Sequence, residues 1–186
     1  MIKLSNITGS DLAKFGQTVF VAMGFTCIHP LTQPALTEIE PAGESPREEK
    51  LEIDYLIPSE KTCLIGTITA TQSIDALKQK HLLFRKNFGI VTKLEKNHLL
   101  WKSLGVPKQL FNKFDAINSY KGFFITTVFE DFETNLPTDP NIHCLYRTGW
   151  KILVDCKRCL DRYSNHPVIG LYKKIHRGRL SPFRFR

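Results

Sequence analysis

The pattern of apolar positions near the start of the chain predicts a helix over residues 10–23. One face of that helix would carry apolar residues at spacings of three and four, namely Leu12, Phe15, Val19 and Met23. Ser10 and Asp11 are suited to cap its start, and Gly24 is suited to end it. Four prolines between residues 26 and 50 then keep the following stretch irregular.

A period of two replaces the helical period after residue 50 and predicts a β-hairpin. Residues 51–57 alternate, with Ile53 and Tyr55 on one side and Glu52 and Asp54 on the other. A turn over residues 58–61 leads into a second strand over residues 62–70, which is rich in β-branched side chains. The alternation gives the second strand two faces, one with Gly66, Ile68 and Ala70 and the other with Ile65, Thr67 and Thr69.

A basic helix is predicted directly after the hairpin. Ser73 caps it, and its buried stripe would consist of Ile74, Leu77, His81, Phe84 and Phe88. Its outward face would carry four basic residues: Lys78, Lys80, Arg85 and Lys86. Patterning further along predicts two helical pieces in residues 92–115, strands over 122–129 and 150–156, and helices over 155–163 and 171–175.

These elements predict an α/β (α+β) fold in which a central mixed sheet is flanked by helices. A chain of 186 residues, 42% of them hydrophobic, suits one such domain, which we expect over residues 1–176 with a basic tail over residues 177–186. No apolar run approaches the roughly 20 residues of a membrane-spanning helix, and the start lacks the pattern of a secretory signal. The odd number of cysteines, five, favours free thiols in a reducing compartment, so we expect a cytoplasmic protein.

The formal charge of +8 is unevenly distributed along the chain. Residues 1–60 contain four Lys or Arg and nine Asp or Glu, a balance of −5, so residues 61–186 carry 22 against 9, a balance of +13. A basic field attracts polyanions, and clustered carboxylates attract divalent cations. The distribution suits a protein that holds nucleic acid near a metal site, although a charge that serves only solubility would look the same.

The hairpin and its flanking helices resemble the core of the PD-(D/E)xK nuclease superfamily over roughly residues 10–90. Glu52-Ile53-Asp54 resembles the first motif strand of that family, and Gly66-Thr67-Ile68-Thr69 takes the place of the second. The resemblance implies a restriction-endonuclease-like core, Mg²⁺-dependent phosphodiester hydrolysis, and Asp54 as the metal-binding Asp. Such hydrolysis needs a hard cation to neutralise developing charge and to activate water.

The second motif departs from the family pattern, because Thr67 stands where the family has Glu and Thr69 where it has Lys. A neutral hydroxyl is a weaker metal ligand than a carboxylate and cannot replace an ammonium group. Hydrolysis is therefore expected to be weak or lost, unless Glu52 supplies a second metal-binding carboxylate and Lys78 or Lys80 supplies the positive charge. The alternatives are a non-catalytic interaction module in a larger DNA-processing or defence assembly, and a plain hairpin with two surface acids.

The basic segments indicate the partner. The four basic residues of the helix after the hairpin would bind phosphates. Aromatic and basic residues also alternate over residues 183–186, where they could contact bases and phosphates, although a flexible arm is the favoured interpretation of the last ten residues. We expect nucleic acid as the partner, with DNA favoured over RNA, and we expect no binding to a membrane. Protein partners and a homodimer stay open as alternatives.

Cys156 and Cys159 form a CxxC pair, with Cys144 upstream and His166 downstream. Four such ligands could hold zinc in a tetrahedron if the fold gathered them. Structural zinc sites usually show a second paired motif, which this chain lacks, so unpaired thiols are favoured over zinc. Mg²⁺ is therefore the expected cofactor.

Overall fold

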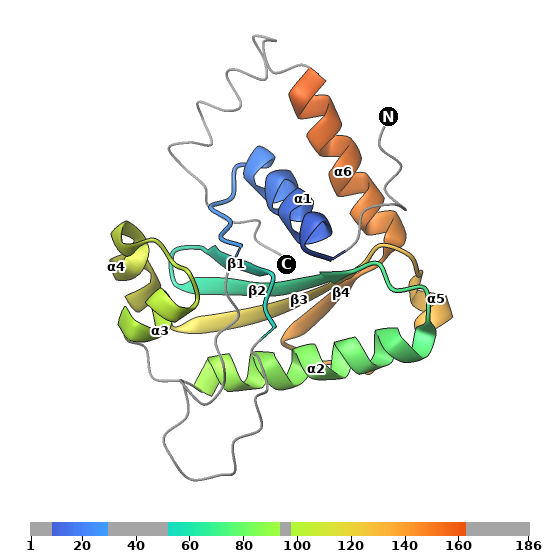
Figure 1. Cartoon of the computed structure of the whole chain (residues 1–186), viewed down its shortest axis with the longest axis horizontal. Coiled ribbons are helices and arrows are strands. Elements are labelled where there is room, and N and C mark those ends of the chain that lie inside the picture. Colours follow the sequence, from blue (N-terminus) through green and yellow to red (C-terminus); the bar gives the residue numbers. More distant parts are fainter. Residues whose placement is uncertain (1–8, 30–51, 94–97, 163–186) are drawn as a thin grey trace.

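The computed structural model describes residues 9–29, 52–93 and 98–162, and at their centre lies a mixed sheet of four strands (Figure 1). In spatial order the strands are β1 (Tyr55–Pro58), β2 (Thr62–Thr69), β3 (Ser119–Thr126) and β4 (Ile142–Leu145). β1 runs antiparallel to β2, and the other two neighbouring pairs are parallel. The expected α/β fold with a mixed sheet flanked by helices is therefore confirmed.

Helices cover both faces of this sheet (Figure 1). One face packs against α2 (Ile74–Lys93), and the other packs against α1 (Gly9–Ala22) and α6 (Arg147–Arg162). At the end of the sheet where β2 and β3 begin lie three short helices: α3 (His98–Ser103), the 3-10 helix η3 (Lys108–Leu110) and α4 (Phe111–Asp115). The short helix α5 (Asp131–Thr134) follows β3 at the opposite end.

Alternation along β2 separates two hydrophobic clusters, one under α2 and one under α1 and α6. Ile65 belongs to the cluster under α2, whereas Ile68 belongs to the cluster under α1 and α6, with Ala70 packed against it. The two predicted faces of this strand are therefore confirmed. Since successive side chains of a strand point to opposite faces, Thr67 and Thr69 lie on the α2 side with Ile65.

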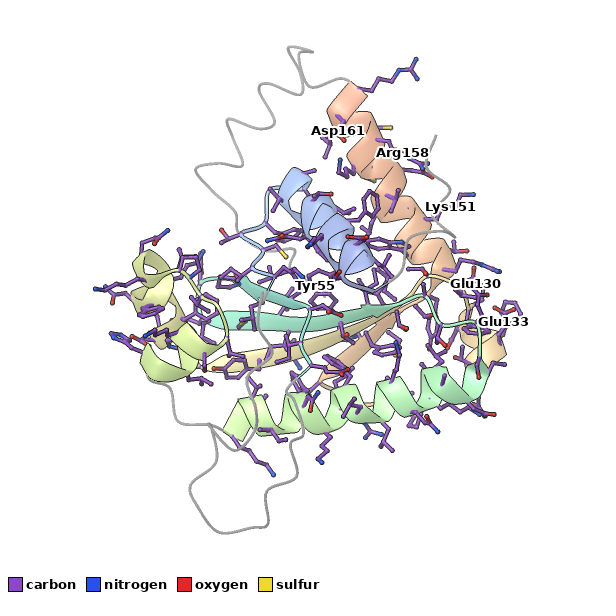
Figure 2. All side chains as sticks on the ribbon, in the orientation of Figure 1. Tyr55, Glu130, Glu133, Lys151, Arg158 and Asp161 are labelled. Atoms are coloured by element: carbon purple, nitrogen blue, oxygen red, sulfur yellow. The ribbon has the colours of Figure 1, made fainter. Side chains whose placement is uncertain are left out.

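Close contact with β1 fixes the position of α1, which forms over nearly the predicted residues. Tyr55 is buried between β1 and α1 (Figure 2), and its hydroxyl donates a hydrogen bond to the carbonyl oxygen of Ala13 (3.1 Å). A Cβ atom at residue 16 would lie 2.0 Å from the Tyr55 hydroxyl oxygen, so Gly16 is what allows the helix to approach this closely. This contact holds α1 against the sheet at Ala13 and Gly16.

The first strand is shorter than predicted, because it begins at Tyr55 rather than at residue 51, which lies outside the described residues. Ile53 packs in the cluster under α2, whereas Tyr55 packs in the cluster under α1 and α6, so the expectation that both share one face is wrong. In the described residues the ladder with β2 extends before Tyr55 by a single hydrogen bond, from Asp54 N to the Gly66 carbonyl oxygen (3.0 Å). Regular pairing of the first strand with β2 therefore begins at Tyr55.

The strand predicted over residues 150–156 is wrong, because these residues belong to α6. In a strand Trp150, Ile152 and Val154 would share a face, but Trp150 and Val154 are buried while Ile152 is 58% exposed. A spacing of four residues instead gives one helical face, which packs toward α1. Glu130, labelled in Figure 2, also stabilises the start of the helix, since its carboxylate accepts hydrogen bonds from the backbone N–H and the hydroxyl of Thr148.

Smaller departures concern short elements and helix ends. The sequence pattern did not predict β4 or α5, which are each four residues long. Ile74, expected in the buried stripe of α2, is 38% exposed because it opens the helix, three residues before the fully buried Leu77; the rest of the stripe is buried. The predicted break near Gly105 is present between α3 and η3, and the helix over 171–175 and the tail over 177–186 lie outside the described residues.

Candidate functional site

A cavity of about 410 Å³ opens beside the edge of β2, where β1 stops pairing with that strand. Six parts of the chain come together here: the start of α1, His29 after α1, the segment before β1, the end of β2, the middle of α2 and Phe124 of β3. Five residues singled out from the sequence line the cavity, namely Glu52, Asp54, Thr67, Thr69 and Lys80. Leu83, Phe84 and Phe124 contribute an apolar part of the lining. The predicted candidates from both strands and from the basic helix therefore meet in one place.

Asp54 takes the place of a strand at the edge of β2. The pairing of β1 with β2 ends at Gly66, and the backbone N–H of Ile68 donates instead to Oδ2 of Asp54 (2.9 Å). The hydroxyl of Thr67 donates to the same carboxylate oxygen (2.6 Å), so the candidate residues Asp54 and Thr67 of the two predicted strands meet across the hairpin. Hydrogen bonds to a charged acceptor are short and strong, so the two donors hold this half-buried carboxylate in place.

Thr69 lies deeper in the structure than Thr67. Its side chain is 3% exposed, and its hydroxyl oxygen accepts a hydrogen bond from the backbone N–H of Thr71 (3.3 Å). Its carbonyl oxygen accepts a second bond from the backbone N–H of Thr127 (3.0 Å). Thr69 therefore lines the cavity while it also supports the turn between β2 and α2.

The four basic residues predicted to bind phosphate have different surroundings. Lys80 lines the cavity. Lys78 and Lys86 are exposed on α2 outside the lining. We refer to Lys78, Lys80 and Lys86 together as the α2 lysines. Arg85 lies 3.5 Å from a carboxylate oxygen of Asp139 in an ion pair. Positive charge thus reaches the cavity from α2, whereas position 69 on β2 carries a neutral hydroxyl.

Three polar residues of the lining were not predicted as site residues: Ser10, His29 and Asn87. Nδ1 of His29 lies 2.8 Å from the carbonyl oxygen of Asp54, and because a carbonyl only accepts, the hydrogen is on Nδ1. Nδ2 of Asn87 donates to the carbonyl oxygen of Glu52 (3.3 Å). Nothing in the local pattern marks His29, but Asn87 is an amide within the buried stripe of α2, a place where a polar group needs a partner.

The lining offers a divalent cation two carboxylates, from Glu52 and Asp54, and the hydroxyl of Thr67. Mg²⁺ is commonly held by one or two carboxylates and keeps several waters, so this donor set fits it. Over residues 9–29, 52–93 and 98–162, no three side chains of His, Cys, Asp or Glu gather closely enough to hold a metal ion by themselves. A cation in this cavity would therefore need water or phosphate oxygens to complete its coordination.

The candidate zinc ligands are not gathered by the part of the chain that the structure describes. The sulfur of Cys144 on β4 lies 3.7 Å from Nε2 of His81, and the two side chains pack on the α2 side of the sheet. Burial raises the pKa of the Cys144 thiol and lowers the pKa of His81, so both groups are neutral here. Cys156 and Cys159 are exposed on α6, on the other side of the sheet, and residue 166 lies outside the described residues.

Comparison of the chain with protein-family models, with curated proteins and with solved structures finds no match. Among the described helices, none combines the length and the apolar character that crossing a membrane requires. The function must therefore be inferred from the cavity and its residues.

Proposed function

We propose that this protein is a nucleic-acid-binding, nuclease-like domain whose divalent-cation-dependent phosphodiester hydrolysis is weak or lost. The observation that carries the proposal is the meeting of the Asp54 carboxylate and the Thr67 hydroxyl (2.6 Å) in a cavity that Glu52 and Lys80 also line. Carboxylates and a cationic side chain around one cavity are suited to hold a phosphate group together with a cation.

Asp54 and Glu52 would hold the cation. Oδ2 of Asp54 is engaged by two internal donors, so Oδ1 is the oxygen that would face a ligand. Glu52, which is exposed, also lines the cavity. A bound Mg²⁺ would neutralise charge on the phosphate and make its bound water more acidic.

Lys80 would bind the phosphate, and the other α2 lysines would extend the contact along the helix. A lysine side chain is a flexible point charge, so a lysine on α2 can act in a cavity whose β2 position 69 is a threonine. Lys78 and Lys86 lie on the exposed surface of the same helix, where nucleic acid would meet them. Positive charge that follows one helix is typical of a surface that binds a polyanion.

Thr67 accounts for the low expected rate. A carboxylate at this position would face Asp54 and add charge for the cation, whereas the Thr67 hydroxyl is neutral and donates its hydrogen to Asp54. The Thr67 hydroxyl thus occupies Oδ2 of Asp54, an oxygen that a cation would otherwise use.

Replacing Thr67 by Glu tests this proposal. We expect Thr67→Glu, alone or with Thr69→Lys, to create or raise Mg²⁺-dependent cleavage of DNA, measured by release of labelled oligonucleotides with and without a chelator. Lys80→Met in the Thr67→Glu background should then lower the rate by about 100-fold, the scale expected when one stabilising charge is removed from a transition state. Lys102→Met is the matched control, since this exposed lysine lies on α3, outside the cavity and apart from the α2 lysines, and it should change the rate little.

The second candidate function is a non-catalytic interaction module. The observation that favours it is that both donors to Asp54 come from the protein itself, so the carboxylate has a structural partner without any ligand. Folded Thr67→Glu and Thr67→Glu/Thr69→Lys variants that cleave neither DNA nor RNA would exclude the nuclease proposal and leave this one.

A further inference from the structure

The segment of residues 52–54 carries both carboxylates of the cavity but forms few backbone hydrogen bonds with the sheet. Among the described residues, the ladder with β2 reaches it only through Asp54 N, which donates to the carbonyl oxygen of Gly66 (3.0 Å). Between the two acids, Ile53 is 1% exposed and anchors the segment in the cluster under α2. The carbonyl groups of Glu52 and Asp54 bond to other parts of the chain.

Side chains from two distant elements bind these carbonyls. His29, which follows α1, donates from Nδ1 to the carbonyl oxygen of Asp54 (2.8 Å), 25 positions away in the sequence. Asn87, on α2, donates from Nδ2 to the carbonyl oxygen of Glu52 (3.3 Å), 35 positions away. Each of the two acidic residues therefore has its own carbonyl group held by one side chain of the cavity lining.

Packing alone does not explain Asn87. Its side chain is 1% exposed, and a buried amide costs free energy unless it is hydrogen-bonded. An apolar side chain of similar size would fill the same space in the buried stripe of α2 without that cost. The hydrogen bond to the Glu52 carbonyl is what an apolar residue could not provide.

We propose that His29 and Asn87 are positioning residues for the carboxylates of Asp54 and Glu52. This inference rests on the proposed function, because it concerns the same cation site. A hydrogen bond to the carbonyl group of a residue fixes the peptide plane that follows it, and so restricts the direction in which that residue projects its side chain. Neither His29 nor Asn87 has to touch the cation or the phosphate to have this effect.

The effect should be visible in metal affinity. Removing a group that orients a metal ligand typically weakens metal binding by about 10- to 100-fold. His29→Leu and Asn87→Leu should each raise the Kd for Mn²⁺ by about 10-fold. His29→Asn should restore the affinity to within about 3-fold of the unaltered protein, because the Asn amide can donate to the Asp54 carbonyl from nearly the position of Nδ1.

The test is Mn²⁺ binding to the full chain, followed by electron paramagnetic resonance of free Mn²⁺, with thermal unfolding of each variant in parallel. Phe88→Leu is the control for weakened packing, since Phe88 is buried on α2 next to Asn87 but does not line the cavity. It should lower the Tm and leave the Kd unchanged. Asp54→Asn reports whether the measured site is the proposed one.

The possible results distinguish failure of the positioning role from failure of the proposed cation site. Binding that Asp54→Asn abolishes, that both Leu variants weaken and that His29→Asn rescues supports the positioning role. Two results overturn the positioning role alone, provided that Asp54→Asn abolishes binding. In the first, the Leu variants leave the Kd unchanged; in the second, His29→Asn weakens binding as much as His29→Leu does. No Asp54-dependent binding of Mn²⁺ by the unaltered protein overturns the cation site and this inference together.

Discussion

Replacing Asp54 by Ala and by Asn should separate the structural role of this carboxylate from a role in cation binding. Ala removes the acceptor of two hydrogen bonds, from the Thr67 hydroxyl (2.6 Å) and from the Ile68 backbone N–H (2.9 Å). Asn keeps an oxygen in the same place but carries no charge, so it can accept these bonds while it offers a cation far less.

The expected magnitudes follow from the two bonds. A hydrogen bond to a charged acceptor contributes about 1.5 to 3 kcal/mol and a neutral one about 1 kcal/mol. Both bonds of Asp54 share one oxygen on a half-buried side chain, so their contributions are not simply additive. We expect Asp54→Ala to lower the free energy of unfolding by about 2 to 4 kcal/mol and Asp54→Asn to lower it by about 1 kcal/mol.

Urea unfolding followed by tryptophan fluorescence measures these differences, since Trp101 and Trp150 are both buried in the core. Glu52→Ala is the matched control, because no described residue donates a hydrogen bond to its exposed side chain, and it should change stability by less than about 0.5 kcal/mol. The reasoning would be refuted by an Asp54→Ala variant as stable as the unaltered protein, or by an Asp54→Asn variant as destabilised as Asp54→Ala.

Three further predictions concern binding, pH and thiols. Changing the three α2 lysines to Glu should weaken nucleic-acid binding at low salt, measured by fluorescence anisotropy, and should reduce the slope of log K against log salt concentration by about one for each phosphate that is no longer bound. The matched control changes three exposed lysines at the other end of the sheet, Lys102, Lys108 and Lys113. Burial, and then the nearby Arg85, lower the pKa of His81 from its ordinary 6.5, so the unfolded chain takes up a proton that the folded protein does not; stability should fall as the pH drops from 7 to 5, and His81→Gln should flatten this loss in urea titrations at each pH. With a thiol reagent such as DTNB, Cys156 and Cys159 should react first and Cys144 more slowly, while the two thiols whose pKa burial raises to about 12 should react only in urea; early reaction of all five would contradict the fold.

Local patterning was sufficient to predict the parts of the fold that depend on short-range periodicity. The alternation of Ile65, Thr67 and Thr69 against Gly66 and Ile68 is a property of the strand itself, so it could be read from the sequence. The apolar run from residue 150 satisfied both periods over seven positions. The longer helix was decided by packing against α1 and by Glu130 at its start, neither of which lies near that run.

The candidate site was predictable only where the hairpin determines it. A short turn and a period of two place Asp54 opposite Thr67, and the structure has this pair. His29 and Asn87 reach the same segment from 25 and 35 positions away, so no local pattern links them to it. That Lys80 rather than Lys78 lines the cavity depends on where α2 crosses the sheet, which is a tertiary property of the fold.

The edge of β2 has a consequence for how copies of this protein behave at high concentration. Strand edges with unpaired N–H groups are templates on which other chains can add a strand and aggregate. At the end of β2 the N–H of Ile68 is already bound by a carboxylate, so an incoming strand would have to displace a charged group to pair there. Asp54 thus protects an open sheet edge against intermolecular pairing, and a substitution that keeps the protein folded but removes this charge would leave the edge more prone to self-association.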